Sequence, residues 1–124
     1  MKKDRLYNFG DMVGRGGRLK YVYPPKQRVL CEVLDTLPDT VEKLYVFGSS
    51  ITLRCGRDSD VDICLIGNIS ANELNQISYS DSPVDVIYCT QEQFDKYQRD
   101  EYDNVYKDVL NTGLLLYDRG NLTQ

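Results

Sequence analysis

Three carboxylates and one Gly-Ser pair are the residues of this chain best suited to chemistry. An apolar run, 44–47, leads into Gly48-Ser49, and Asp60-Val61-Asp62 follows further along the chain. Asp85 lies within a later apolar run, 84–89. Side chains two residues apart in a strand share one face, so both aspartates of the first pair are predicted to point the same way. We therefore expect the three carboxylates to converge at one end of a sheet.

A divalent cation is the natural ligand for such a group. Neighbouring ionised carboxylates repel each other, and burying them is costly unless a cation neutralises them. Because the chain contains no histidine, its oxygen ligands favour Mg²⁺ or Mn²⁺ over Zn²⁺. Gly48 allows close approach to the backbone, and Ser49 with the N–H groups of a following helix can hold a phosphate. A metal site beside a phosphate cradle indicates nucleotide chemistry.

These motifs resemble a known family. The segment 47–65, with its Gly-Ser and Asp-x-Asp pairs, is similar to the signature of the DNA polymerase beta-like nucleotidyltransferase superfamily, and the small size points to its minimal members. Residues 105–117, with a helix, Gly113 and an apolar run, are similar to the end of such domains. The resemblance covers roughly 25–118. It implies an α/β (α+β) fold, with a small mixed sheet flanked by helices.

The resemblance also implies an activity, which is the transfer of a nucleoside monophosphate, AMP from ATP, to a hydroxyl with Mg²⁺ or Mn²⁺. In the family's two-metal scheme, Asp60 and Asp62 bridge both ions, and Asp85 completes the site that activates the acceptor. Minimal members usually carry Ala-Arg-Gly where this chain has Ile51-Thr52-Leu53, so the usual arginine contact to phosphate is missing, and Arg54 and Arg57 are the candidates to replace it. The expected nucleotide-binding residues are Gly48, Ser49, Ser50, Arg54 and Arg57.

The acceptor follows from the sequence less directly than the reaction does. Among minimal members, the implied role is the antitoxin-like half of a toxin–antitoxin pair, which adenylylates a HEPN-type RNase partner. The alternative is a catalytically inactive nucleotide- or partner-binding module on the same fold, which the departure at Thr52-Leu53 favours and the three intact carboxylates oppose. A homo-oligomer and a nucleic-acid partner are both compatible with the sequence.

Other interpretations of the same residues are weaker. An EF-hand calcium loop starting at Asp58 would need glycine and glutamate at 63 and 69, where both residues are isoleucine. A solvated acidic turn is an equal alternative for Asp58 alone. The cysteines show no C-x-x-C spacing and are predicted to be reduced core residues; they are Cys31, Cys55, Cys64 and Cys89.

Length and charge divide the chain into an arm and one domain. Its 124 residues have room for a single domain, here 25–124, preceded by an arm, 1–24. Residues 1–26 carry seven Lys or Arg against two Asp, and the net charge of the whole chain is −4. The body is therefore acidic, which argues against non-specific nucleic-acid binding. With no signal-like or membrane-spanning apolar stretch, the sequence predicts a cytoplasmic protein.

Hydrophobic periodicity predicts alternating helices and strands. Pro24-Pro25 opens the first helix. Ser70 and the Thr90/Gln93 pair are predicted helix caps, and Gly113 is predicted to end the last helix. The expected helices are 24–37, 51–55, 71–77, one beginning after Thr90, and 101–111; the expected strands are 43–47, 61–66, 84–89 and 114–117.

Overall fold

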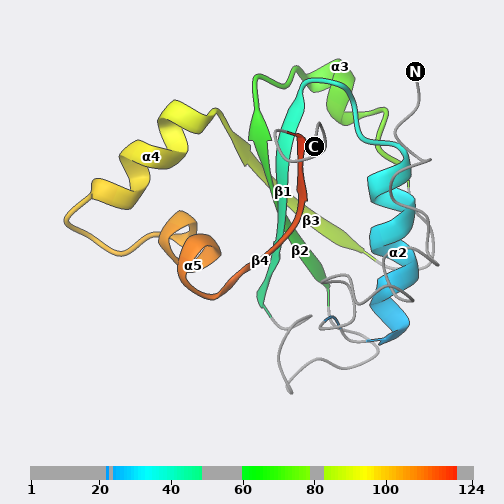
Figure 1. The fold of residues 1–124 in the computed structure, drawn as a ribbon, viewed down its shortest axis with the longest axis horizontal. Helices are drawn as coiled ribbons and strands as arrows, with labels where there is room; N and C mark the ends of the chain where they lie inside the picture. The colour runs from blue at the N-terminus through cyan, green and yellow to red at the C-terminus, as the bar shows by residue number, and fades with distance from the viewer. Residues whose placement is uncertain (1–21, 23, 49–59, 79–82, 120–124) are drawn as a thin grey trace.

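A four-stranded mixed sheet lies at the centre of the molecule (Figure 1). The computed structural model describes residues 22, 24–48, 60–78 and 83–119. The order of the strands is β3-β2-β1-β4, with β1 antiparallel to β2 and β4 and with β2 parallel to β3. This arrangement confirms the predicted α/β (α+β) class. The strands are β1 (Val41–Phe47), β2 (Val61–Gly67), β3 (Val84–Cys89) and β4 (Leu114–Asp118).

Helices cover both faces of this sheet. Figure 1 shows α2 (Pro24–Asp35) on one side, and α4 (Gln91–Arg99) with α5 (Val105–Thr112) on the other. The short α3 (Ala71–Leu74) follows β2. None of the helices in the described part of the chain is long and apolar enough to cross a membrane.

The face toward α2 carries the larger hydrophobic core. Leu30 and Leu34 of α2 are fully buried, as are Leu44 of β1 and Ile63 of β2. Each such side chain stabilises the fold by about 1.5–3 kcal/mol. The helix is also tied to Val22, two residues before it, because the buried Gln27 Nε2 donates a 2.9 Å hydrogen bond to the Val22 carbonyl. This core holds the central strands, β1 and β2, against α2.

The opposite core is smaller and aromatic. Phe94 of α4 stacks on Tyr45 of β1 with ring centroids 5.8 Å apart, and meets Tyr106 of α5 edge-on at 6.3 Å. Tyr97 stacks on Tyr106 at 4.4 Å. Such ring pairs add about 0.5–1.5 kcal/mol each beyond their burial. They dock α4 and α5 on the sheet.

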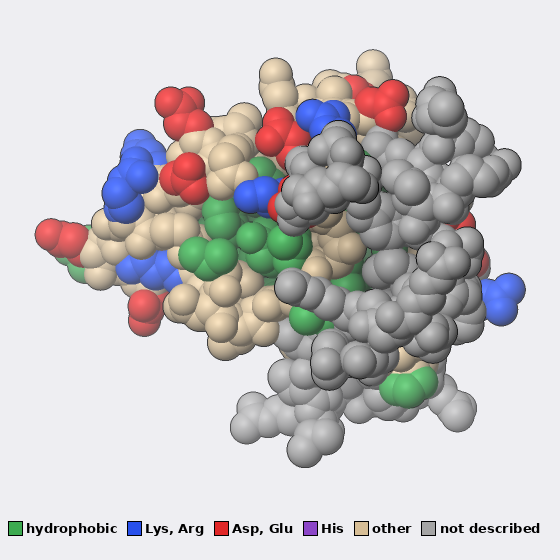
Figure 2. Space-filling model, in the orientation of Figure 1, with side chains coloured by type: hydrophobic (Ala, Val, Ile, Leu, Met, Phe, Trp, Pro, Cys, Tyr) green, Lys and Arg blue, Asp and Glu red, His purple; other side chains and the backbone are tan. Residues whose placement is uncertain are grey.

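The outer surface of α4 and α5 is mixed. Figure 2 shows charged side chains of both signs around this part of the molecule, with apolar side chains between them. Tyr102 is 79% exposed, and Val105 and Leu110 are also exposed. Single exposed apolar side chains of this kind are normal on a soluble surface.

The helix caps agree with the sequence better than the helix lengths do. Ser70 and Thr90 each form the predicted capping interaction, and both complete a capping box. The helix expected over 71–77 ends at Leu74, because the next turns tighten to i→i−3 hydrogen bonds. The helix expected from 101 begins at Val105, because Asn104 accepts a hydrogen bond from Lys107 N and caps it.

The other boundaries need smaller corrections. The helix expected over 24–37 ends at Asp35, and β1 begins two residues before the predicted 43. Cys31, Cys64 and Cys89 are free and buried, as predicted. The predicted helix 51–55, Cys55 and nearly all of the basic arm lie outside the described residues.

Candidate functional site

The antiparallel pairing of β1 with β2 delivers Gly48 to the beginning of β2. Phe47, the last residue of β1, pairs with Asp62, so Gly48 lies just beyond this pair. Its φ of +77° is a left-handed conformation that glycine adopts without steric cost. The chain can therefore turn sharply out of the sheet directly beside Asp62.

Two of the predicted carboxylates lie next to each other in this region. Asp62 of β2 and Asp85 of β3 are direct partners in the parallel register. Neighbouring strands are about 4.8 Å apart, and register partners point to the same face. Val61 and Ile63 flank Asp62 and are fully buried on the opposite face, as predicted. Packing of these two neighbours against α2 thus aims Asp62 away from that helix.

The pKa of Asp62 is raised above its ordinary value by burial and by the neighbouring carboxylates. Burial is the largest cause, and the nearby charges of Asp85 and then Asp60 act in the same direction. A side-chain hydrogen bond with Asp85 also favours the protonated form of Asp62. Asp62 is half-buried whereas Asp85 is exposed. The carboxyl groups of Asp62 and Asp85 therefore lie close together.

Asp60 stands slightly apart from the pair. It is exposed and lies one residue before β2, which begins at Val61 as predicted, so the expectation that Asp60 and Asp62 share one strand is wrong. Its charge still reaches Asp62. Within the described ranges, no group of three or more His, Cys, Asp or Glu side chains is drawn together as a metal-binding cluster. The described carboxylates form a close pair with a third charge nearby.

The space beside the pair is shaped by the absence of a side chain at Gly48. A Cβ built there would lie 2.5 Å from Asp62 Oδ2. The carboxylate of Asp62 thus occupies a space that the Cβ of any other residue at position 48 would fill. The carboxylates of Asp62, beside Gly48, and of the exposed Asp85 are both oxygen donors, which suit a hard divalent cation such as Mg²⁺. The chemistry of the described donors therefore fits the predicted metal.

The remaining predicted site residues cannot be placed. Ser49, Ser50, Arg54 and Arg57 lie outside the described residues. The Gly48–Asp62 contact is the feature that the sequence missed, because it joins residues fourteen apart through strand pairing. The only sequence signal for this contact is a glycine directly after one predicted strand and an aspartate at the start of the next.

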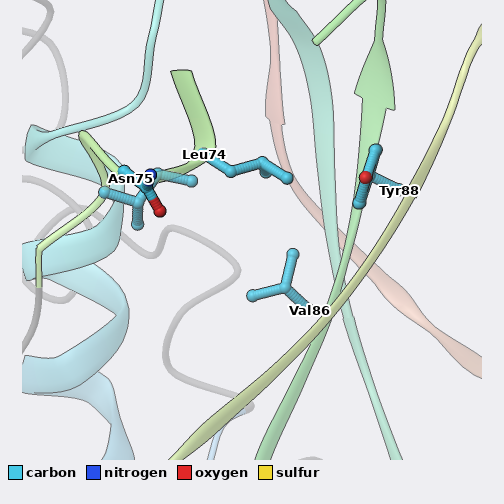
Figure 3. Close-up of a pocket in the computed structure, with 5 residues that line it drawn as sticks. Leu74, Asn75, Val86 and Tyr88 are labelled. Atoms are coloured by element: carbon cyan, nitrogen blue, oxygen red, sulfur yellow. The ribbon is translucent and has the colours of Figure 1, made fainter. Parts of the chain in front are cut away.

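A separate hollow lies on the other face of β3. It has a volume of about 260 Å³ and is lined by Leu74, Asn75, Ile77, Val86 and Tyr88. Figure 3 shows Leu74 and Asn75 on one side, and Val86 and Tyr88 of β3 on the other. Side chains of a strand alternate between faces, so Val86 and Tyr88 point away from the face that carries Asp85. This hollow is not part of the carboxylate site.

Comparison with known proteins agrees with this geometry. The model of the nucleotidyltransferase domain family matches residues 27–116, which is most of the chain. No curated protein and no solved structure matches it. The match includes β1, β2, β3, the first three residues of β4 and both members of the carboxylate pair. The chain therefore belongs to the nucleotidyltransferase domain family, as a minimal member of the DNA polymerase beta-like superfamily.

Proposed function

We propose that this domain transfers a nucleoside monophosphate, AMP from ATP, to a hydroxyl acceptor in a reaction that depends on Mg²⁺ or Mn²⁺. Membership of the family supports nucleotidyl transfer in general. The observation that carries the more specific proposal is the register of Asp62 with Asp85 beside the Gly48 turn. A protein that only needed to fold would gain nothing from two repelling carboxylates on adjacent strands.

In this reaction the oxygen of the acceptor hydroxyl attacks the α-phosphorus of the nucleotide. The bond from that phosphorus to the bridging oxygen of the β-phosphate breaks, and pyrophosphate leaves with the electron pair. Asp60, Asp62 and Asp85 are the residues that would hold the metal. When bound, the metal lowers the pKa of the acceptor hydroxyl and neutralises charge on the leaving group. The protein mainly has to position the reactants.

Each predicted residue has a role in this scheme. Asp62, which lies against Gly48, and Asp60 would hold the ion that accompanies the triphosphate, and Asp85 would serve the ion on the acceptor side. The exposure of Asp85 leaves it open to an incoming hydroxyl. Gly48, Ser49, Ser50, Arg54 and Arg57 are proposed to contact the triphosphate.

A protein hydroxyl is the acceptor that the resemblance favours. We infer a partner such as a HEPN-type RNase, in a toxin–antitoxin pair. The cytoplasm is the expected compartment, because reduced thiols such as those buried here persist there.

Labelled nucleotide tests the reaction directly. The protein is incubated with Mg²⁺ and ATP labelled at the α-phosphate, together with candidate acceptors that include the products of neighbouring genes. We expect label to enter one acceptor from α-labelled ATP and none from γ-labelled ATP, since pyrophosphate leaves. Asp85→Asn is the matched control, because the amide keeps the shape of the carboxylate and removes its charge. Label entering from the γ-position instead would overturn the proposal in favour of a kinase.

A second function is favoured by one sequence observation. Ile51-Thr52-Leu53 stands where minimal members usually carry Ala-Arg-Gly, so the domain would bind a nucleotide or a partner without turnover. Calorimetric binding of ATP with no transfer to any acceptor would support this alternative.

A further inference from the structure

The carboxylate of Asp62 occupies the space that a side chain at position 48 would fill. A Cβ at Gly48 would lie 2.5 Å from Asp62 Oδ2, 3.4 Å from Cγ and 3.6 Å from Cβ. Within the described part of the chain, the three nearest atoms therefore all belong to this one side chain. Real Cβ atoms essentially never approach a heavy atom within 3.0 Å. One of the two groups would have to move if Gly48 were replaced.

The carboxylate is the group that would move. The backbone of Asp62 is held in β2, between the antiparallel partner Phe47 and the parallel partner Asp85. Its neighbours Val61 and Ile63 are fully buried, which opposes any shift of the strand. A carboxylate at the end of a short side chain can instead rotate about χ1. The rotation carries it out of the conformation in which it meets Asp85.

We propose that Gly48 is a positioning residue for Asp62: by lacking a Cβ, it leaves the space that fixes this carboxylate opposite Asp85. The inference rests on the proposed function, because the conformation of Asp62 matters to the reaction only if Asp62 binds the metal. It differs from a contact between Gly48 and phosphate, since it acts on the metal-binding residue before any nucleotide is present.

The test is metal binding by the protein without nucleotide. Free Mn²⁺ is titrated and followed by electron paramagnetic resonance for the wild type, Gly48→Ala, Gly48→Asn and Asp62→Asn. Changes to groups that orient metal ligands typically weaken binding about 10–100-fold, and we expect a loss of this size for both Gly48 variants. Gly48→Asn supplies a Cβ in a residue that tolerates positive φ better than alanine does, so a loss of equal size in both variants does not follow backbone strain.

A double variant separates the proposed route from a general disturbance. If Gly48 acts through Asp62, adding Gly48→Ala to Asp62→Asn produces no further loss of Mn²⁺ affinity, because the group being positioned has already been disabled. If the two losses instead multiply, Gly48 acts independently of Asp62 and the inference is wrong. Circular-dichroism melts of each variant establish that the folded protein is being titrated.

The remaining outcomes distinguish this inference from the proposed function. If Asp62→Asn weakens Mn²⁺ binding while Gly48→Ala binds like the wild type, the metal site stands and Gly48 does not position it. A loss of ATP affinity alone in that variant would assign Gly48 to the phosphate. If the wild type and Asp62→Asn bind Mn²⁺ alike, the proposed metal site fails, and the positioning role of Gly48 fails with it.

Discussion

The two ends of the β1–β2 ladder each carry a glycine with positive φ, but the two glycines are limited by different atoms. At one end Val41 pairs with Gly67, and at the other Phe47 pairs with Asp62 beside Gly48. A Cβ at Gly67 would collide with the backbone carbonyl oxygen of Thr40. Among the described residues, the nearest atoms to a Cβ at Gly48 all belong to the side chain of Asp62.

This difference separates a requirement of the fold from a requirement of the site. The backbone around Gly67 cannot yield without breaking strand pairing, so that end of the ladder stabilises the fold. The carboxylate of Asp62 can move by rotation, so a substitution at the Gly48 end of the ladder leaves the fold intact but displaces a residue of the proposed site. We therefore expect changes at the Gly48 end to lower activity more than stability, and the reverse at the Gly67 end.

The largest effect is expected from the carboxylates. Asp62→Asn and Asp85→Asn should each lower the rate of transfer about a thousandfold, because metal-held charge contributes several kcal/mol to the transition state. Asp62→Asn should also weaken ATP binding, whereas Asp85→Asn should leave it nearly intact, as expected for an interaction made mainly in the transition state. Single-turnover rates and ATP titrations separate these effects. Wild-type turnover by Asp85→Asn with the true acceptor would make this carboxylate structural.

The second-largest effect is expected at the Gly67 end of the β1–β2 ladder. Gly67→Ala should lower the free energy of unfolding by about 2–4 kcal/mol, because it combines an unfavourable φ with a backbone clash. Its φ is +156°, a conformation that L side chains rarely adopt. Urea denaturation measures the loss, and the specific activity of the remaining folded protein should match that of the wild type. A variant that is stable but inactive would contradict the comparison.

Much of the fold could be predicted because its signals are local. Apolar runs identified all four strands, and β3 matched the predicted 84–89 at both ends. The caps at Ser70 and Thr90 were also predictable, since each is formed by residues three apart in the sequence. Helix ends set by weaker signals, such as Asn104 before α5, were misplaced by several residues.

The site could be predicted only in part because its contacts are not local. The alternation of Val61, Asp62 and Ile63 predicted correctly that the aspartate points away from the buried face. The pairing of Asp62 with Asp85 depends on the parallel register of β2 and β3, and the Gly48–Asp62 contact depends on the register of β1 and β2. Neither register can be derived from periodicity, because shifted pairings can bury the same apolar faces.

A smaller effect is expected when the metal-free protein is titrated. The pKa of Asp62 is raised in the folded state, so the folded protein binds this proton more tightly than the unfolded chain does. This contribution to stability is complete below the ordinary pKa of aspartate, and is lost as the pH rises through the raised pKa. In EDTA, the wild type should therefore lose stability relative to Asp62→Asn as the pH rises from acid to neutral.

Metal should reverse this order. Saturating Mg²⁺ with ATP neutralises the repulsion in the wild type, and a ligand at a hundredfold its dissociation constant adds about 2.7 kcal/mol to stability. Urea unfolding at neutral pH, with and without ligand, measures the change for both proteins. If the wild type gains no more than Asp62→Asn, the carboxylate pair does not bind metal.

The smallest effect is expected where neither end of the ladder is touched. Thr90 follows β3 at the end remote from Asp85, and its Oγ1 accepts a 3.1 Å hydrogen bond from Gln93 N. Thr90→Ala removes this cap and should cost about 1 kcal/mol of stability. Ser70→Ala is the matched control, because Ser70 completes the same kind of capping box with Glu73 on the much shorter α3. Both variants should keep the wild-type transfer rate when assayed well below their melting temperatures. A rate loss confined to Thr90→Ala would mean that the docking of α4 on the aromatic core affects the position of the carboxylates through β3. Activity would then depend on packing across the face of the sheet, and not only on the residues at the Gly48 end of the ladder.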